Sequence, residues 1–273
     1  MRAAEWINLT FFLFAIVASL RLKLGQAQRL GALGIGAVGI ALIVALQGLR
    51  SWLPPGAVSL VRDWLPVPMM ILAYRQGGML FTEPRKGVQD LLERFDRLWF
   101  KSGARVRPSG GHYWMAEFLE LSYMSCYAVV PAGLGVLYLA GAAASAATFW
   151  AVVLPPTYLC YGLVAFFPTL PPRTLLPAPK AGQKTGLLRV LNLWILKYGS
   201  IQVNNFPSPH VAASVAVSLA LLHLGLAAGW IFMVVALCIA LGAVWGRYHY
   251  AADALLAAAL AVVTFGLETH SLF

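Results

Sequence analysis

Two histidines, His210 and His249, lie where polar loops run into long apolar segments. Such boundaries let a membrane protein keep titratable groups beside water. Asp253 follows His249 by four residues, so the two share one face if a helix begins by about residue 249. The carboxylate can then accept a hydrogen bond from one ring nitrogen, which fixes the tautomer and leaves the other nitrogen free to attack. His249 is therefore a candidate nucleophile.

His210 follows the short run Pro207-Ser208-Pro209. Ser208 is typical of a helix N-cap and Pro209 of the first helical position, which puts His210 in the first turn of a helix. The positive end of a helix and its free backbone amides suit a phosphate group, so Ser208 is also a candidate phosphate-binding residue. A histidine at this place can give a proton to a departing alcohol.

Arg173 follows two prolines at the end of an apolar segment. The prolines favour a rigid extended turn, and a guanidinium there can bind phosphate oxygens in a fork. An even number of predicted membrane crossings separates this turn from the two histidine turns. We therefore expect Arg173, His210, His249 and Asp253 to meet on one side of a membrane.

The composition indicates an integral membrane protein, because 60% of the 273 residues are hydrophobic and 11% are charged. One soluble core could not bury that much apolar surface. Apolar segments of about twenty residues, the length that spans a bilayer, are predicted at 6–21, 30–49, 57–74, 115–140, 146–167, 211–227, 229–246 and 250–267. The sequence thus predicts an all-α, polytopic membrane helix bundle with about eight, or seven to eight, transmembrane helices.

Two long polar connections contain amphipathic stretches, at 89–100 and 184–197, which we expect to form helices in the membrane surface. We expect N-terminal transmembrane helices and an interfacial helix over residues 1–112, and a catalytic bundle over residues 113–273, in one structural unit overall. The tyrosines near His249, Tyr248 and Tyr250, are expected in an aromatic belt at the membrane boundary.

The net charge of +10 gathers in the polar connections. The basic residues are scattered among apolar ones and form no nucleic-acid-binding motif, so the expected partners are membrane lipids, anionic or phosphorylated, and not nucleic acid. Lys and Arg concentrate after the first, third, fifth and seventh predicted spans. By the positive-inside rule, this distribution places those loops and both histidines in the cytoplasm.

Three sequence blocks resemble the signature of the type 2 phosphatidic acid phosphatase (PAP2) superfamily, in its order and at its loop positions. The blocks are Pro171-Pro172-Arg173, Phe206-Pro207-Ser208-Pro209-His210 and His249-Tyr250-Ala251-Ala252-Asp253. The resemblance covers roughly residues 115–267 and is nearest to the branch that includes inositol phosphorylceramide synthases.

The resemblance implies a membrane phosphatase or phosphotransferase that acts on a lipid phosphate or a phospholipid headgroup. By this resemblance His249 would attack phosphorus and form a phosphohistidine, and Asp253 would orient it. His210 would protonate the leaving group and Arg173 would bind the phosphate, with no metal or other cofactor.

The chain departs from the family pattern at two cationic positions. The family usually has a lysine seven residues before the first-block arginine and an arginine six residues before the nucleophile; Phe166 and Ala243 stand there. Arg247 and Lys197 are candidate substitutes for phosphate binding. Pro209 replaces a small residue and removes one amide donor, which suggests a variant pocket suited to a phosphodiester.

Two other functions are also compatible with the sequence. The missing cations leave open a non-enzymatic lipid-binding or transport protein on the same fold. A metal-dependent membrane enzyme would instead use His210, His249 and Asp253 as ligands of a transition metal.

Overall fold

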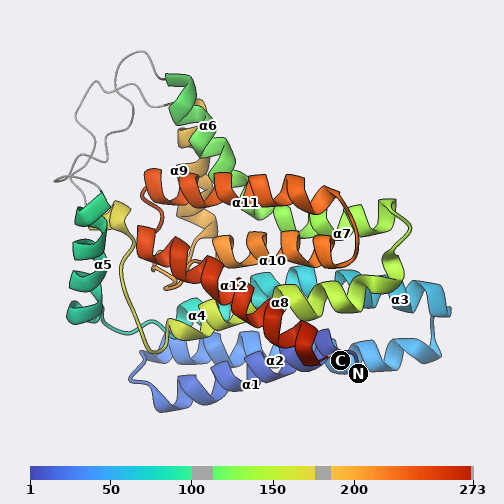
Figure 1. The fold of residues 1–273 in the computed structure, drawn as a ribbon. Helices are drawn as coiled ribbons and strands as arrows, with labels where there is room; N and C mark the ends of the chain where they lie inside the picture. Colours follow the sequence, from blue (N-terminus) through green and yellow to red (C-terminus); the bar gives the residue numbers. More distant parts are fainter. Residues whose placement is uncertain (100–112, 176–185, 272–273) are drawn as a thin grey trace.

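The structure, a computed structural model, describes residues 1–99, 113–175 and 186–271. Within these ranges the regular elements are helices, apart from one isolated bridge between Thr169 and Asn204. The α-helices are α1 (Ala3–Arg21), α2 (Gln26–Gly48), α3 (Pro55–Trp64), α4 (Pro66–Met79), α5 (Lys86–Trp99), α6 (Tyr113–Met124), α7 (Val129–Leu139), α8 (Ala146–Leu163), α9 (Leu187–Gly199), α10 (Pro209–His223), α11 (Ala228–Trp245) and α12 (Ala251–Ser271). Figure 1 shows them as a bundle of long helices, which confirms the all-α fold class.

Helices long and apolar enough to cross a membrane confirm an integral, multi-pass membrane protein. Six such segments lie in the described residues: Ala3–Arg21, Gln26–Gly48, Pro55–Met79, Ala143–Leu163, Ala228–Trp245 and Ala251–Thr269. A seventh is counted if α6 and α7, which are bent by 65° at a short break, form one broken span. The described chain therefore has six to seven candidate spans where the sequence predicted seven to eight.

The difference in number comes from α10, which stands where a span was predicted at 211–227, and from the bend in the span predicted at 115–140. This helix has 15 residues, and at 1.5 Å per residue it is about 22 Å long, shorter than the ~30 Å hydrocarbon core. It packs against α7, α8, α11 and α12, and nearly all of its residues are buried. Hydropathy alone does not separate a short core helix from a span, since both are apolar all round.

The N-terminal helices pack onto the rest of the bundle. The helices α1 and α2 form a tightly packed hairpin. A Cβ at Gly39 of α2 would lie only 2.5 Å from the ring of Phe12 of α1. Both α1 and α4 contact α8. The boundary expected at residue 112 lies outside the described residues.

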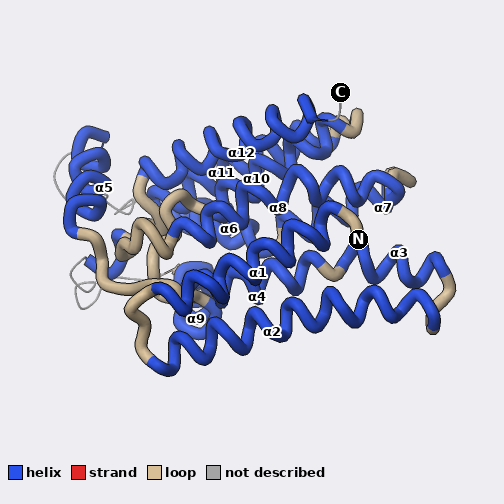
Figure 2. Tube along the Cα trace, turned by 90° about the horizontal axis from the view of Figure 1, so that it is seen from below, coloured by secondary structure: helices blue, strands red, loops and turns tan. Residues whose placement is uncertain are grey.

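The amphipathic stretches form α5 and α9, which lie crosswise to the long helices at one end of the bundle (Figures 1 and 2). On α9, the apolar side chains of Leu187, Val190, Trp194 and Tyr198 are exposed, whereas Asn192 faces inward and is buried. Residue 100 and residues 184–185, at the ends of the predicted stretches, lie outside the described residues. The N-termini of α10 and α12 are at the same end as α5 and α9, so this end holds both histidines.

Candidate active site

His249 and Asp253 form a pair where α11 turns into α12. His249 lies in the turn and Asp253 in the first turn of α12, with His249 Nδ1 3.2 Å from Asp253 Oδ2. Both residues are buried, with 5% and 0% of their surface exposed. Because the carboxylate engages Nδ1, Nε2 is the ring nitrogen left to face a substrate.

The Asp253 carboxylate is held by more than the histidine. Its Oδ2 also accepts hydrogen bonds from the backbone N–H of Tyr250, at 3.0 Å, and from Asn204 Nδ2, at 3.0 Å. Together with His249, three donors therefore converge on one oxygen, which fixes the orientation of the carboxylate. Asn204 was not among the residues that the sequence pattern suggested.

His210 is the second residue of α10, with Ser208 at the N-cap and Pro209 at the first helical position, as predicted. The centroid of its ring lies 5.8 Å from that of His249. The two imidazoles are therefore close enough for one phosphate group to contact both.

Ser208 does not use its hydroxyl to cap the helix, contrary to the expectation for an N-cap serine. Its side chain makes no capping hydrogen bond, and Oγ is buried with no partner in the described protein. The backbone N–H of Ser208 instead donates to the carbonyl oxygen of Asp253 at 3.2 Å. A buried hydroxyl without a protein partner is available to a ligand oxygen.

Arg173 lies in a 3-10 turn, Pro172–Leu175, and is half-buried. Its backbone N–H donates to the carbonyl oxygen of Arg247 at 3.0 Å, and its Nη2 is buried with no hydrogen-bond partner in the described protein. Burial, and then the positive charge of Arg173, lower the pKa of His249 to about 3. His249 is therefore neutral near neutral pH, the state in which a ring nitrogen can act as a nucleophile.

The two candidate substitute cations lie in different surroundings. Arg247 is in the turn before His249 with a left-handed φ of 62°, and burial lowers the pKa of its guanidinium. Lys197 is exposed on α9, and its ammonium lies 5.2 Å from the centroid of the Tyr198 ring. Within the described chain, the structure brings Arg247 beside the pair and gives Lys197 no polar contact with the other candidates.

Both substituted positions have apolar neighbours. Ala243 is fully buried on α11, in a cluster with Leu196 and two tyrosines. Phe166 is about half exposed, and its ring lies 6.3 Å from that of Phe14. These contacts are those of core and lipid-facing side chains.

The prediction that Tyr248 and Tyr250 belong to an aromatic belt is wrong, since only 1% and 2% of these residues are exposed. The hydroxyl of Tyr248 donates to Glu120 Oε2 at 2.6 Å and accepts from Asn192 Nδ2 at 2.8 Å. Arg189 also donates to this hydroxyl and pairs with Glu120 at 2.8 Å. Polar partners inside the bundle therefore satisfy the phenol that would otherwise need water.

This polar network supports both histidines. The ring of Tyr248, the residue before His249, stacks on that of Tyr123 with centroids 3.9 Å apart. The ring of Tyr123 lies edge-on to His210, with centroids 5.6 Å apart. The sequence signal for this network was Glu120, one of two acidic residues in the apolar helix α6, because a buried carboxylate needs a partner.

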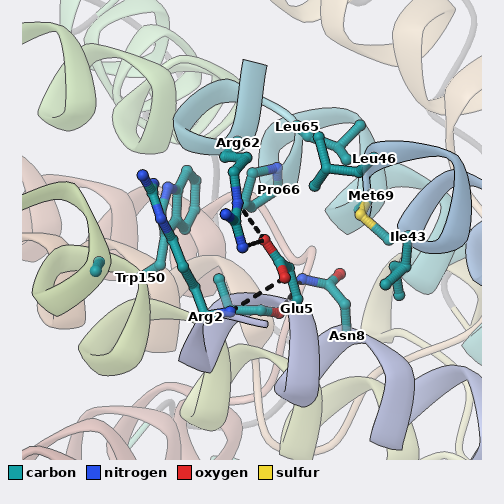
Figure 3. Close-up of a pocket in the computed structure, with 12 residues that line it drawn as sticks. Arg2, Glu5, Asn8, Ile43, Leu46, Arg62, Leu65, Pro66, Met69 and Trp150 are labelled. Atoms are coloured by element: carbon teal, nitrogen blue, oxygen red, sulfur yellow. Dashed lines mark hydrogen bonds and ion pairs between the residues drawn. The ribbon is translucent and has the colours of Figure 1, made fainter. Parts of the chain in front are cut away.

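A second polar cluster lies at the opposite end of the bundle (Figure 3). Glu5 Oε1 and Arg62 Nη2, both buried, are 2.5 Å apart, and Gln47 Nε2 donates to Glu5 at 3.0 Å. Arg2 pairs with Asp63 beside them. The cavity beside them, of about 10 Å³, has room for roughly one water molecule. The cluster therefore joins α1, α2 and α3 and leaves little space for a ligand.

In residues 1–99, 113–175 and 186–271, no group of three or more His, Cys, Asp or Glu side chains is arranged to hold a metal ion. His210, His249 and Asp253 are thus not arranged as such a group.

Comparison with known proteins gives one match. The family model described as the PAP2 superfamily matches residues 90–267, which include every candidate site residue. No curated protein and no solved structure shows a significant match to the chain.

Proposed function

Since the chain belongs to the PAP2 superfamily, whose activity is of the lipid phosphate phosphatase or phosphotransferase type, we propose that it transfers phosphate through His249. The proposed substrate is a lipid phosphate or a phospholipid headgroup. The observation that carries the proposal is the arrangement of the two histidines. Their ring centroids are 5.8 Å apart, and Nδ1 of His249 faces Asp253. Two segments that are separate in the sequence supply these groups.

In the first step, His249 Nε2 attacks phosphorus, and the bond from phosphorus to the lipid oxygen breaks. The new P–N bond leaves a positive charge on the ring, which the adjacent carboxylate of Asp253 stabilises. Burial, His249 and Arg173 lower the pKa of His210 to about 3 without substrate, so the negative charge of the bound phosphate must favour its protonated form. His210 then gives its proton to the departing lipid oxygen. Arg173 and Ser208 bind phosphate oxygens through Nη2 and Oγ, the two buried atoms that have no partner in the described protein.

In the second step, neutral His210 takes a proton from water or from an alcohol, and the resulting oxygen attacks the phosphohistidine. The P–N bond breaks and His249 returns to its neutral state. Water gives hydrolysis, and an alcohol gives transfer. We propose transfer to a lipid alcohol as the form to test first, because of the resemblance to the inositol phosphorylceramide synthase branch.

Replacing the nucleophile tests the proposal. His249→Ala should lower turnover of lipid phosphate substrates by at least about 10³-fold, as for other catalytic nucleophiles, while the protein still inserts into membranes. His223→Ala is the matched control, because His223 lies at the far end of α10, against Phe265. Assays that measure both released phosphate and lipid products separate hydrolysis from transfer. Unchanged turnover in His249→Ala would refute the mechanism.

A non-enzymatic lipid-binding role is the second candidate. It is favoured by the apolar surroundings of Phe166 and Ala243, where the family has cations. Labelled substrate and rapid quenching distinguish the two functions. A phosphohistidine that is trapped in the parent protein and missing in His249→Ala supports the enzyme. The lack of any covalent label on folded parent protein that binds the lipid supports the lipid-binding role.

A further inference from the structure

We propose that Asn204 is a positioning residue that holds the Asp253 carboxylate against His249. The role rests on the proposed function, since it concerns the alignment of the nucleophile. Asn204 is fully buried in the loop before α10. It touches neither imidazole in the described contacts, so it acts through Asp253.

The side-chain amide of Asn204 joins two segments. Its Nδ2 donates one hydrogen bond to Asp253 Oδ2 at 3.0 Å and another to Thr169 Oγ1 at 3.1 Å. The backbone N–H of Asn204 also donates to the carbonyl oxygen of Thr169 at 3.0 Å. Both protons of the amide are therefore in use, which fixes its orientation.

Asn204 is the donor that ties Asp253 to the rest of the site. Of the three donors on Oδ2, His249 and Tyr250 lie in the same turn as Asp253 and move with it. Asn204 comes from the loop that leads to His210, and its backbone N–H donates to the carbonyl oxygen of Thr169, four residues before Arg173. This backbone bridge sets the spacing of those two segments, and the hydrogen bond from the amide to Oδ2 sets the position of the carboxylate that orients the nucleophile.

A purely structural role does not explain this amide well. Asn204 Oδ1 is buried and has no hydrogen-bond partner in the described protein. A buried acceptor without a partner lowers stability. A residue selected for packing alone would avoid that loss, whereas a donor is needed to hold a carboxylate in one orientation.

The test compares kcat and KM of Asn204→Ala and Asn204→Asp with a matched control, Thr169→Val. Thr169→Val removes the other acceptor of the same amide and keeps the side-chain shape and the backbone bridge. We expect Asn204→Ala to lower kcat roughly 10- to 100-fold, as for other residues that orient a functional histidine, with KM within about threefold. Thr169→Val should stay within about threefold of the parent in both constants.

Asn204→Asp keeps the volume of the side chain but replaces the donor with a carboxylate that repels Asp253. Its kcat, measured above neutral pH, should fall at least about tenfold. If Asn204→Ala does not fold, this variant alone tests the positioning role of Asn204. Full activity in Asn204→Asp, or equal losses in Asn204→Ala and Thr169→Val, would overturn the role of Asn204. Activity that survives His249→Ala would instead overturn the proposed function, so the two failures are distinguishable.

Discussion

Replacing Asp253 with Asn isolates the negative charge beside His249. The carbonyl oxygen of an asparagine can occupy the place of Oδ2, where three donors converge. The amide nitrogen cannot, because it would face those donors. His249 should therefore keep its tautomer in Asp253→Asn and lose only the carboxylate charge.

The size of the loss follows from the distance between the charges. His249 Nδ1 lies 3.2 Å from Oδ2, and the positive charge of the phosphorylated ring spreads beyond that nitrogen. Taking an effective separation of about 4 Å and an effective dielectric constant of about 20 gives about 4 kcal/mol. At 1.36 kcal/mol for each factor of ten, kcat should fall about 10³-fold.

The assay measures kcat and KM of the purified protein with a lipid phosphate in detergent. KM should stay near that of the parent, because Asp253 does not contact the substrate in the proposed mechanism. Glu93→Gln is the control for removing a carboxylate, since Glu93 contacts Arg97 and Gln89 of its own helix, α5. A loss of kcat of less than about tenfold in Asp253→Asn would refute the reasoning on charge.

Three further predictions concern stability, pH and phosphate binding. Arg62→Met should lower the free energy of unfolding by about 3–5 kcal/mol, because it leaves Glu5 buried without its partner, whereas Arg97→Met on the surface should cost less than about 1 kcal/mol; equal thermal shifts would contradict this. The pKa of His249 is lowered to about 3 from 6.5, so its contribution to stability should be complete above about pH 6.5 and be lost as the pH falls toward 3. Unfolding in denaturant measured against pH checks that direction, with His249→Ala as the variant in which this part of the dependence disappears. Ser208→Ala should raise KM severalfold without lowering thermal stability, since the hydroxyl has no protein partner to lose; a destabilised protein with unchanged KM would show that the hydroxyl is structural.

The sequence predicted the helical membrane bundle well, because long apolar segments can hide their backbone only as helices. It also predicted that His249 and Asp253 would meet, but through one face of a helix that began by about residue 249. The helix α12 begins at Ala251, so His249 reaches the carboxylate from the turn before it. It could not predict that α10 is a short core helix, because hydropathy does not report packing depth. Nor could it predict the bend between α6 and α7.

The site residues that the sequence did not predict have partners far away along the chain. Asn204 lies 35 residues from Thr169 and 49 from Asp253 along the chain. Tyr248 lies 128 residues from Glu120. Hydrophobic periodicity describes which face of a helix is buried and carries no information on such pairs. The pattern therefore predicts Tyr248, beside a loop, at the membrane boundary, although it lies inside the bundle.

The loops of the site are joined to one another through their main chains. The backbone N–H groups of Arg173, Asn204 and Ser208 donate to the carbonyl oxygens of Arg247, Thr169 and Asp253, respectively. Such bonds do not depend on which side chain a residue carries. Natural variation or directed evolution can therefore exchange neighbouring side chains, and with them the preferred headgroup, without disturbing the spacing of the reacting groups.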